Sequence, residues 1–471
     1  MRKAHFASTR ALVIALSLAL SACASAPHSA SLPQYELPAS LALEGQGAAD
    51  WQDWAGIWQD QALQDLLREA DARNQDLQQA AARLEEARAA SQAAHANLFP
   101  ALDLYANNSR TRSSANTGRL PAGAKLTSND FNWGLAASYE LDVWGKLGQA
   151  DAAARARVLA AQSNRAAVRM SLYANVVQHY LNLRALDAQY ALLQALHSSR
   201  SQAHAVLQKR FAAGLANQLE LNLAQQEVLA AAQSLSQAQQ ARSQTEAALA
   251  MLAGRSPAQI ASPQIARGAD LPSLLARSRL PQDTPSEVLQ RRPDVRAAQA
   301  GLQAAQADLA QARSLYFPSL RLTAAYGRES REMSDLFSPS SMLWNLAANL
   351  TQPIFRSGSI DAVVAGSNAR QQQAIAQYAQ SVQAAFRDVH DALGAYAAGE
   401  HNLLAQQQRH TLAQQNRAMQ RQREARGLQS ALEAANHERD SLQAELALLE
   451  AQRQQLQALL GVYRALGGGA A

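Results

Sequence analysis

Apolar and polar residues alternate along four short stretches of the chain, which predicts four half-buried strands. The clearest stretch is 131–143, in which every second residue is apolar and so lies on one face of a strand. The other stretches lie near 100–113, 318–328 and 342–353, and the first of these alternates less cleanly. Strands of about ten residues with one apolar face are typical of a transmembrane barrel, but an ordinary sheet packed on helices gives the same pattern.

Long stretches between the strands predict helices. They are rich in Ala, Gln, Leu, Arg and Glu, which are strong helix formers, and almost free of Pro and Gly. From Gly145 to Gly214 there is room for a helix of about 60 residues and about 90 Å. Apolar residues then recur in steps of three and four along 375–396 and 442–463, which indicates coiled-coil packing. An ordinary coiled coil without a pore would show this spacing as well.

The predicted elements occur twice in the same order. The matched landmarks are NLFPAL (97–102) with YFPSLRL (316–322), Gly145 with Gly358, and Gly214 with Gly427. In each copy 69 residues separate the two glycines, a coincidence that chance rarely produces. We therefore expect one duplicated architecture in which each repeat contains a helix, two strands and a long helical hairpin.

The duplication divides the chain into four parts. We expect a leader at 1–22, a first repeat at 23–254, a linker at 255–290 and a second repeat at 291–471. The hairpin tips are expected at the glycines 214 and 427, because glycine permits the positive φ of a tight turn between helices. The linker is rich in Pro and Ser, and we expect it to form part of a belt around the hairpins.

The leader has the pattern of a secretory signal. Basic residues precede an apolar core at 11–22, which is shorter than the ~20 residues needed to cross a bilayer. The motif LSAC, which ends at Cys23, resembles the lipobox of bacterial lipoproteins. This resemblance implies that 1–22 is removed and that Cys23 carries lipid. An ordinary signal peptide with a cysteine there by chance is the alternative.

The composition limits the reactions and the partners that are expected for this chain. Cys23 is the only cysteine, so the chain can form no internal disulfide. The whole chain has 43 basic and 38 acidic residues, and removal of the three basic residues of the leader leaves 40 against 38. This balance does not favour nucleic acid as a partner. Histidines are scattered and no phosphate-binding loop is present, so we expect no enzyme activity, no cofactor and no metal site.

Taken together, the lipobox, the duplication, the strands and the hairpins resemble the TolC-like outer-membrane efflux proteins, in the lipoprotein branch that serves drug pumps. The most specific segments are RRPDVRAAQAGLQAAQADLAQARSLYFPSL (291–320), TQPIFRSGSI (351–360) and YRALGGG (463–469). The resemblance covers essentially the whole mature chain. It implies a mixed but mostly α fold, in which a homotrimer forms a 12-stranded transmembrane β-barrel, four strands per protomer, continued by a 12-helix periplasmic α-barrel.

The same resemblance implies a function in the bacterial outer membrane. The protein would be the channel of a tripartite efflux pump that lets small toxic compounds or drugs pass to the exterior. Its partners would be a periplasmic adaptor (membrane fusion) protein and an inner-membrane transporter of the RND type. Two alternatives stay open: a duct for protein secretion by an ABC-type system, and a lipid-anchored periplasmic coiled-coil scaffold without a pore.

Site residues follow from the resemblance position by position. The hairpin tips imply adaptor contacts at Arg210, Gly214, Leu215, Glu220, Arg423, Gly427 and Leu428. Family members carry an acidic gate six and nine residues after the second tip glycine, positions that hold Glu433 and Asn436 here. Three symmetry-related Glu433 carboxylates would attract cations, whereas Asn436 departs from the family pattern and weakens the acidic ring.

Overall fold

The computed structural model describes residues 40–41, 54–117, 125–280, 284–285, 290–426 and 431–468. These residues form two compact units, and each unit combines segments from both halves of the chain. The described part of the first unit consists of residues 90–117, 125–156 and 302–375, and that of the second of residues within 35–89, 157–301 and 376–471.

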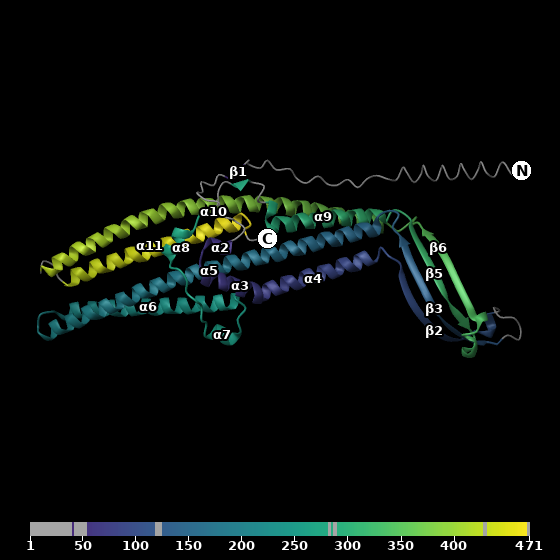
Figure 1. Cartoon of the computed structure of the whole chain (residues 1–471), viewed down its shortest axis with the longest axis horizontal. Coiled ribbons are helices and arrows are strands. Elements are labelled where there is room, and N and C mark those ends of the chain that lie inside the picture. The colour runs from purple at the N-terminus through teal and green to yellow at the C-terminus, as the bar shows by residue number, and fades with distance from the viewer. Residues whose placement is uncertain are drawn as a thin grey trace. The chain divides into compact units, whose positions relative to one another are not determined.

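The first unit contains an antiparallel sheet of four strands in the order β2-β3-β5-β6 (Figure 1). The strands are β2 (Ala101–Arg112), β3 (Thr127–Leu141), β5 (Ser319–Ser330) and β6 (Met342–Thr351). Each lies close to a stretch in which the sequence alternates. Among the described strands, β2 and β6 each pair on one side only, so the sheet has two open edges.

The register of the second hairpin repeats that of the first. Ala101 pairs with Ser138 in the first hairpin, and Ser319 pairs with Thr351 in the second. Ser319 lies 218 positions after Ala101 and Thr351 lies 213 positions after Ser138, the same offsets that relate the sequence motifs. β3 begins at Thr127, whereas β5 ends at Ser330 opposite Phe131, so the outer residues 127–130 of β3 pair with β2 alone.

Close backbone contact between β3 and β5 requires two glycines. Gly134 pairs directly with Gly327. A Cβ at Gly134 would lie 2.6 Å from the carbonyl oxygen of Tyr326 and 2.7 Å from the Cα of Gly327, which is too close for any side chain. The two repeats therefore join within the sheet through a contact that only glycine permits.

The helices of the two repeats have equal lengths. α4 (Gln75–Ala96) and α9 (Pro293–Ser314) have 22 residues each and precede β2 and β5. α5 (Lys146–Ala212) and α10 (Ser359–Ala425) have 67 residues each, and α6 (Gln218–Leu252) and α11 (Ala431–Ala465) have 35 each. Gly145 and Gly358, with φ of +74° and +76°, precede the 67-residue helices. Within the described ranges, no helix combines the length and apolarity needed to cross a membrane.

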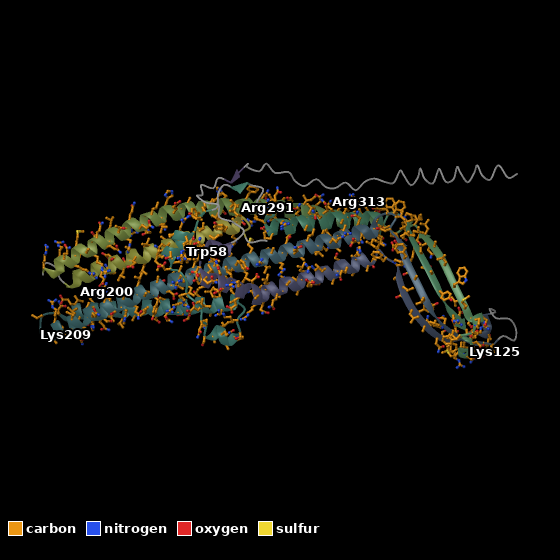
Figure 2. The ribbon with its side chains drawn as sticks, viewed as in Figure 1. Trp58, Lys125, Arg200, Lys209, Arg291 and Arg313 are labelled. Carbon is orange, nitrogen blue, oxygen red and sulfur yellow. The ribbon has the colours of Figure 1, made fainter. Side chains whose placement is uncertain are left out.

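The main core of the second unit forms where the linker meets four helices. α3 (Gln61–Arg73), the middle of α5 and the ends of α6 and α11 contribute buried Leu, Val and Tyr side chains, and Trp58 is fully buried (Figure 2). From the linker, Ile265, Leu271 and Leu274 join this core. The smaller elements are β1 (Ser40–Leu41), α2 (Trp54–Ile57), α7 (Pro257–Ala261), α8 (Leu271–Arg277) and β4 (Thr284–Pro285), with 3-10 turns at Ala115–Thr117, Met333–Asp335 and Pro339–Ser341.

A buried carboxylate fixes the linker to this core. Asp60 caps α3 by accepting from the backbone N–H of Leu63 at 3.1 Å. It also accepts from the Tyr180 hydroxyl at 3.1 Å and from the backbone N–H of Ala269 at 2.8 Å. One side chain thus joins α3, α5 and the linker, so the linker around Ala269 is a packed part of the second unit.

Candidate functional site

The first hairpin tip is a tight turn closed by glycine. Gly214 has φ +73°, and its N–H donates to the carbonyl of Phe211 at 2.9 Å. The N–H of Leu215 donates to the carbonyl of Arg210 at 2.8 Å. These two bonds satisfy the last carbonyls of α5 in the manner of a Schellman motif, which places glycine in the left-handed position.

Glu220 has a defined role at the same tip. The Asn217 side chain accepts from the N–H of Glu220 at 2.9 Å, and the Glu220 carboxylate accepts from the N–H of Asn217 at 3.1 Å. This capping box begins α6. Glu220 is predicted above only as a contact candidate, although the spacing of Asn217 and Glu220 is itself the signal of a capping box.

The surface of the first tip is apolar with a basic edge. Leu215 is 71% exposed, and Leu219 is exposed as well. Figure 2 shows Lys209 at the closed end of the α5–α6 hairpin, next in sequence to Arg210. The turn therefore brings Arg210, Gly214, Leu215 and Glu220, all exposed, within one short segment, 210–220.

The second tip is described in part. Arg423 is exposed in the last turn of α10, while Gly427 and Leu428 lie outside the described residues. Glu433 and Asn436 lie in the first turns of α11, and their side chains lie outside the described part. Glu438, which is not among the predicted site residues, follows them. It accepts from the Ser199 hydroxyl of α5 and from Arg417 of α10, the latter at 3.1 Å.

An aromatic pair packs at the point where β3 leads into α5. Trp144, after β3, stacks on Phe317, before β5, with ring centroids 4.9 Å apart and planes at 18°. The Trp144 indole N–H donates to the carbonyl of Pro318 at 2.8 Å. Asp142 accepts from the backbone N–H groups of Leu147 and Gly148 at 2.9 and 2.7 Å, which caps α5. The turn at Trp144 and the Phe317-Pro318 segment are therefore in direct contact.

The RRPD motif is an anchor for the end of the chain. The Arg292 side chain is 6% exposed and donates to Asp294, Asp388 and the Ala465 carbonyl at 2.9 Å each. The Tyr463 hydroxyl donates to the carbonyl of Arg279 at 2.6 Å, and burial raises the pKa of Tyr463 to about 12. The motif thus joins α9, α10 and the end of α11.

The described residues contain no candidate metal-binding cluster. None of them forms a group of three or more His, Cys, Asp or Glu side chains able to hold a metal ion. The features that stand out are therefore surfaces and edges: one exposed tip and a sheet with two open edges.

Comparisons with known proteins identify the family of the chain. The model of a family described as outer membrane efflux protein matches residues 66–255 and 284–468. OprJ, an outer membrane protein of Pseudomonas aeruginosa, is 36% identical over 414 residues, which cover 84% of this chain and 81% of OprJ. CusC, a cation efflux system protein of Escherichia coli K12, is 30% identical over 402 residues, which cover 84% of this chain and 85% of CusC.

A solved structure agrees with the sequence comparisons. The crystal structure of the open state of the Neisseria gonorrhoeae MtrE outer membrane channel matches with a TM-score of 0.78 and 30% identity, over 94% of this chain and 99% of MtrE. The predicted resemblance and fold class are confirmed. The chain belongs to the outer membrane efflux protein family and is an efflux component of the outer membrane with a TolC-like fold.

Proposed function

We propose that this efflux protein is the passive exit duct of a tripartite pump and works as a homotrimer. The observation that supports the proposal is the four-stranded sheet with two open edges and an exposed apolar face. An open strand edge is too costly in lipid, because its backbone groups have no hydrogen-bond partner there. Three copies would close the edges into a ring of twelve strands, with the apolar face toward lipid and the polar face toward water.

Transport through such a duct needs no catalysis by this chain. A ring whose water-facing side carries Asn, Ser and Thr together with charged residues such as Asp103, Glu140 and Arg321 offers a wet path. The energy would come from an inner-membrane transporter of the RND type. The protein would therefore act as a channel and not as an enzyme, without a cofactor, and selection of cargo would rest with the transporter. We propose small toxic compounds or drugs as the cargo.

CusC is by name part of a cation efflux system, whereas ArpC of Pseudomonas putida, which is 31% identical to this chain, is by name part of an antibiotic efflux pump. Similarity alone therefore does not choose between cations and drugs. The gate position Asn436 favours drugs, because one amide in place of a carboxylate lowers the negative charge that three copies would gather there.

We propose Cys23 as the lipid attachment site, and the barrel as a second, independent anchor. Cys23→Ala is expected to lose the lipid, since no other thiol exists, yet to reach the outer membrane in part. Metabolic labelling with a palmitate analogue and gradient separation of membranes measure the two properties. Label on the Cys23→Ala protein, or complete loss of folded trimer, would contradict this assignment.

The tips are proposed to bind a periplasmic adaptor. A photo-crosslinking residue at Leu215 is expected to capture an adaptor (membrane fusion) protein in cells, because this exposed leucine sits at the closed end of the first hairpin. A second probe at Leu428 tests the other tip. Mass spectrometry of the captured protein is the measurement.

A matched probe at Leu229 of α6 controls for general exposure, since this leucine is also exposed but lies well away from the turn. Capture of an RND-linked adaptor by the tip probe alone would support the pump. An adaptor of an ABC system would replace the proposal with the secretion alternative, and equal capture at both positions would remove the tip as the contact.

A further inference from the structure

The end of β2 that leads into the first turn of the sheet carries two arginines on the apolar face of the strand. The strand pairs one by one with residues 127–138 of β3, so its side chains alternate between the two faces without a bulge. Leu102 and Leu104, which are 67% and 70% exposed, therefore share a face with Arg110 and Arg112. In the proposed duct this face meets lipid, so both arginines lie on the lipid side of the barrel.

The opposite face has a different chemistry at the same end of the sheet. It carries Ser109 and Thr111 of β2 and, paired with them, Asp130 and Ser128 of β3. That face would line the water-filled pore, where an arginine is easily hydrated. The charges are instead separated by face, with the acid toward the pore and both bases toward lipid. An arginine on the lipid face is costly unless it lies at the interface, so this placement indicates an anionic partner there.

Both arginines lie at the outer boundary of the apolar band. Phe131 of β3 shares their face and pairs with Asn108, two residues before Arg110. Aromatic residues mark the interfaces of outer-membrane barrels, in which the apolar band is about 25 Å tall and the strands tilt by about 40°. Arg110 lies eight residues after Leu102, about 27 Å along the strand and about 21 Å along the membrane normal. The proposed duct has its helices in the periplasm, so the arginines are expected at the head groups of the outer surface.

The ladder holds the two arginines in place and leaves their charges available. β2 stays joined to β3 beyond them, because the N–H of Ser113 donates to the carbonyl of Leu126 at 2.8 Å. Arg110 and Arg112 are exposed, and neither forms an ion pair with another of the described residues. Arg328, on the same face of β5, differs because it donates to the carbonyl of Ser338 at 2.7 Å. The two arginines of β2 therefore keep their donors free for a ligand.

We propose that Arg110 and Arg112 bind the phosphate groups of lipopolysaccharide in the outer leaflet of the membrane. The lipid A part of this molecule carries its phosphates where acyl chains meet sugars, which is the level of the two arginines. Alternate residues of a strand lie about 7 Å apart, so two guanidinium groups on one face can converge on one phosphate. Figure 2 shows Lys125 at the same end of the sheet, where this exposed cation adds to the attraction for anionic lipid. The inference rests on the proposed trimeric duct and adds a lipid ligand at its outer end.

Two variants of the full-length protein separate the position of the charges from their presence. Arg110→Gln with Arg112→Gln removes both cations and adds no charge to either face. The face-swapped variant combines Ser109→Arg, Arg110→Ser, Thr111→Arg and Arg112→Thr, which moves both cations to the pore face and leaves composition and net charge unchanged. If charge alone attracts the lipid, only the glutamine variant loses binding, whereas both variants lose it if the lipid-facing position is required.

Binding is measured by native mass spectrometry of the detergent-solubilised trimer, titrated with bisphosphorylated lipid A. Each basic residue beside an anionic lipid contributes about a factor of five, so the glutamine variant is expected to raise the apparent dissociation constant about 30-fold. The face-swapped variant is expected to show the same loss. Equal binding by the wild type and the glutamine variant would overturn the inference, and so would wild-type binding by the face-swapped variant.

Three further probes identify the chemistry that is bound. Lipid A without its two phosphates is expected to bind the wild type as weakly as intact lipid A binds the glutamine variant. Phosphatidylglycerol has one phosphate and fewer acyl chains, so it is expected to bind more weakly than lipid A. Millimolar inorganic phosphate is expected not to displace lipid A, because it lacks the acyl chains.

The same probes can contradict the assignment. Tight binding of the dephosphorylated lipid would remove the phosphate contact. Equal binding of phosphatidylglycerol would replace lipopolysaccharide with any anionic lipid, and displacement by inorganic phosphate would replace it with a free anion.

The level of heat-resistant trimer separates this inference from the proposed duct. The wild type and both variants are expected to form the trimer, and the glutamine variant is expected to keep the wild-type conductance. Wild-type protein without a conducting trimer would contradict the duct itself. A conducting trimer whose lipid A binding is unchanged in the glutamine variant would remove the lipid site alone. If the face-swapped variant does not assemble, the glutamine variant decides the outcome.

Discussion

Leu346→Arg is expected to remove the protein from the outer membrane as a folded trimer and to abolish efflux. Leu346 lies in the middle of β6, is 74% exposed, and shares the apolar face with Trp344. An arginine near the bilayer midplane of a barrel costs about 2–4 kcal/mol, so three copies would lose about 6–12 kcal/mol. The measurements are the amount of heat-resistant trimer in isolated outer membranes, conductance in planar bilayers and drug susceptibility of the cells.

The neighbouring residue supplies the control. Asn345 pairs with Ala325 and points to the opposite face of β6 from Leu346. Asn345→Arg is expected to leave the trimer level unchanged and to alter only conductance, because that face would meet water. If both variants lost the trimer, or if neither did, the two faces of the sheet would not differ in their contact with lipid. A lipid-anchored scaffold without a pore would then explain the exposed apolar face better.

Arg292→Ala is expected to lower the free energy of unfolding of the helical part by about 3 kcal/mol, the low end for breaking a buried ion pair, because both carboxylates keep partial access to water. The change removes the donor to the Ala465 carbonyl and leaves Asp294 and Asp388 without their shared cation. The measurement is the thermal loss of helix in the detergent-solubilised protein, monitored by circular dichroism.

Arg291 provides the comparison, because it precedes Arg292 in the sequence but is exposed. Arg291→Ala should change stability by less than about 0.5 kcal/mol, as surface changes usually do. Arg292→Lys keeps one charge but has a single donor group, so it should fall between the two. Equal melting of the Arg291 and Arg292 alanine variants would show that the RRPD motif does not anchor the end of the chain.

Much of this fold could be predicted because each element carries its own periodic signal. Alternation marked the strands to within a few residues, and the glycines at 145, 214 and 358 marked where the long helices begin or end. The equal lengths of the paired helices follow from the same duplication that the sequence motifs reveal. Local rules were sufficient there, because backbone geometry alone decides these positions.

Other features depended on partners far away in the sequence. Residues 127–130 are polar on both faces and showed no alternation, yet β2 holds them in a ladder. Asp60 resembles any surface acid in the sequence, and only the fold brings it to Tyr180 and Ala269. Arg292 was singled out as part of a motif, but its contact with Ala465 spans 173 positions and could not be read from spacing.

The candidate site likewise combines features that the sequence predicts with features that only the fold reveals. The first tip could be predicted as a turn from Gly214, and the fold does place Arg210, Leu215 and Glu220 around it. Its role toward an adaptor stays a prediction, as do the gate roles of Glu433 and Asn436. The carboxylate of Glu438 was missed because its partners lie on two other helices.

The unequal strand lengths have a consequence for the outer rim. β3 continues four residues beyond its pairing with β5, so the β2–β3 ladder extends about 14 Å past the end of the β3–β5 ladder. In the proposed threefold ring, the longer β2–β3 ladders and the shorter β5–β6 ladders would alternate around the outer rim. In the proposed ring, a bacteriophage or antibody approaching the cell would then meet three such extended ladders, built from Ser109–Arg112 and Thr127–Asp130.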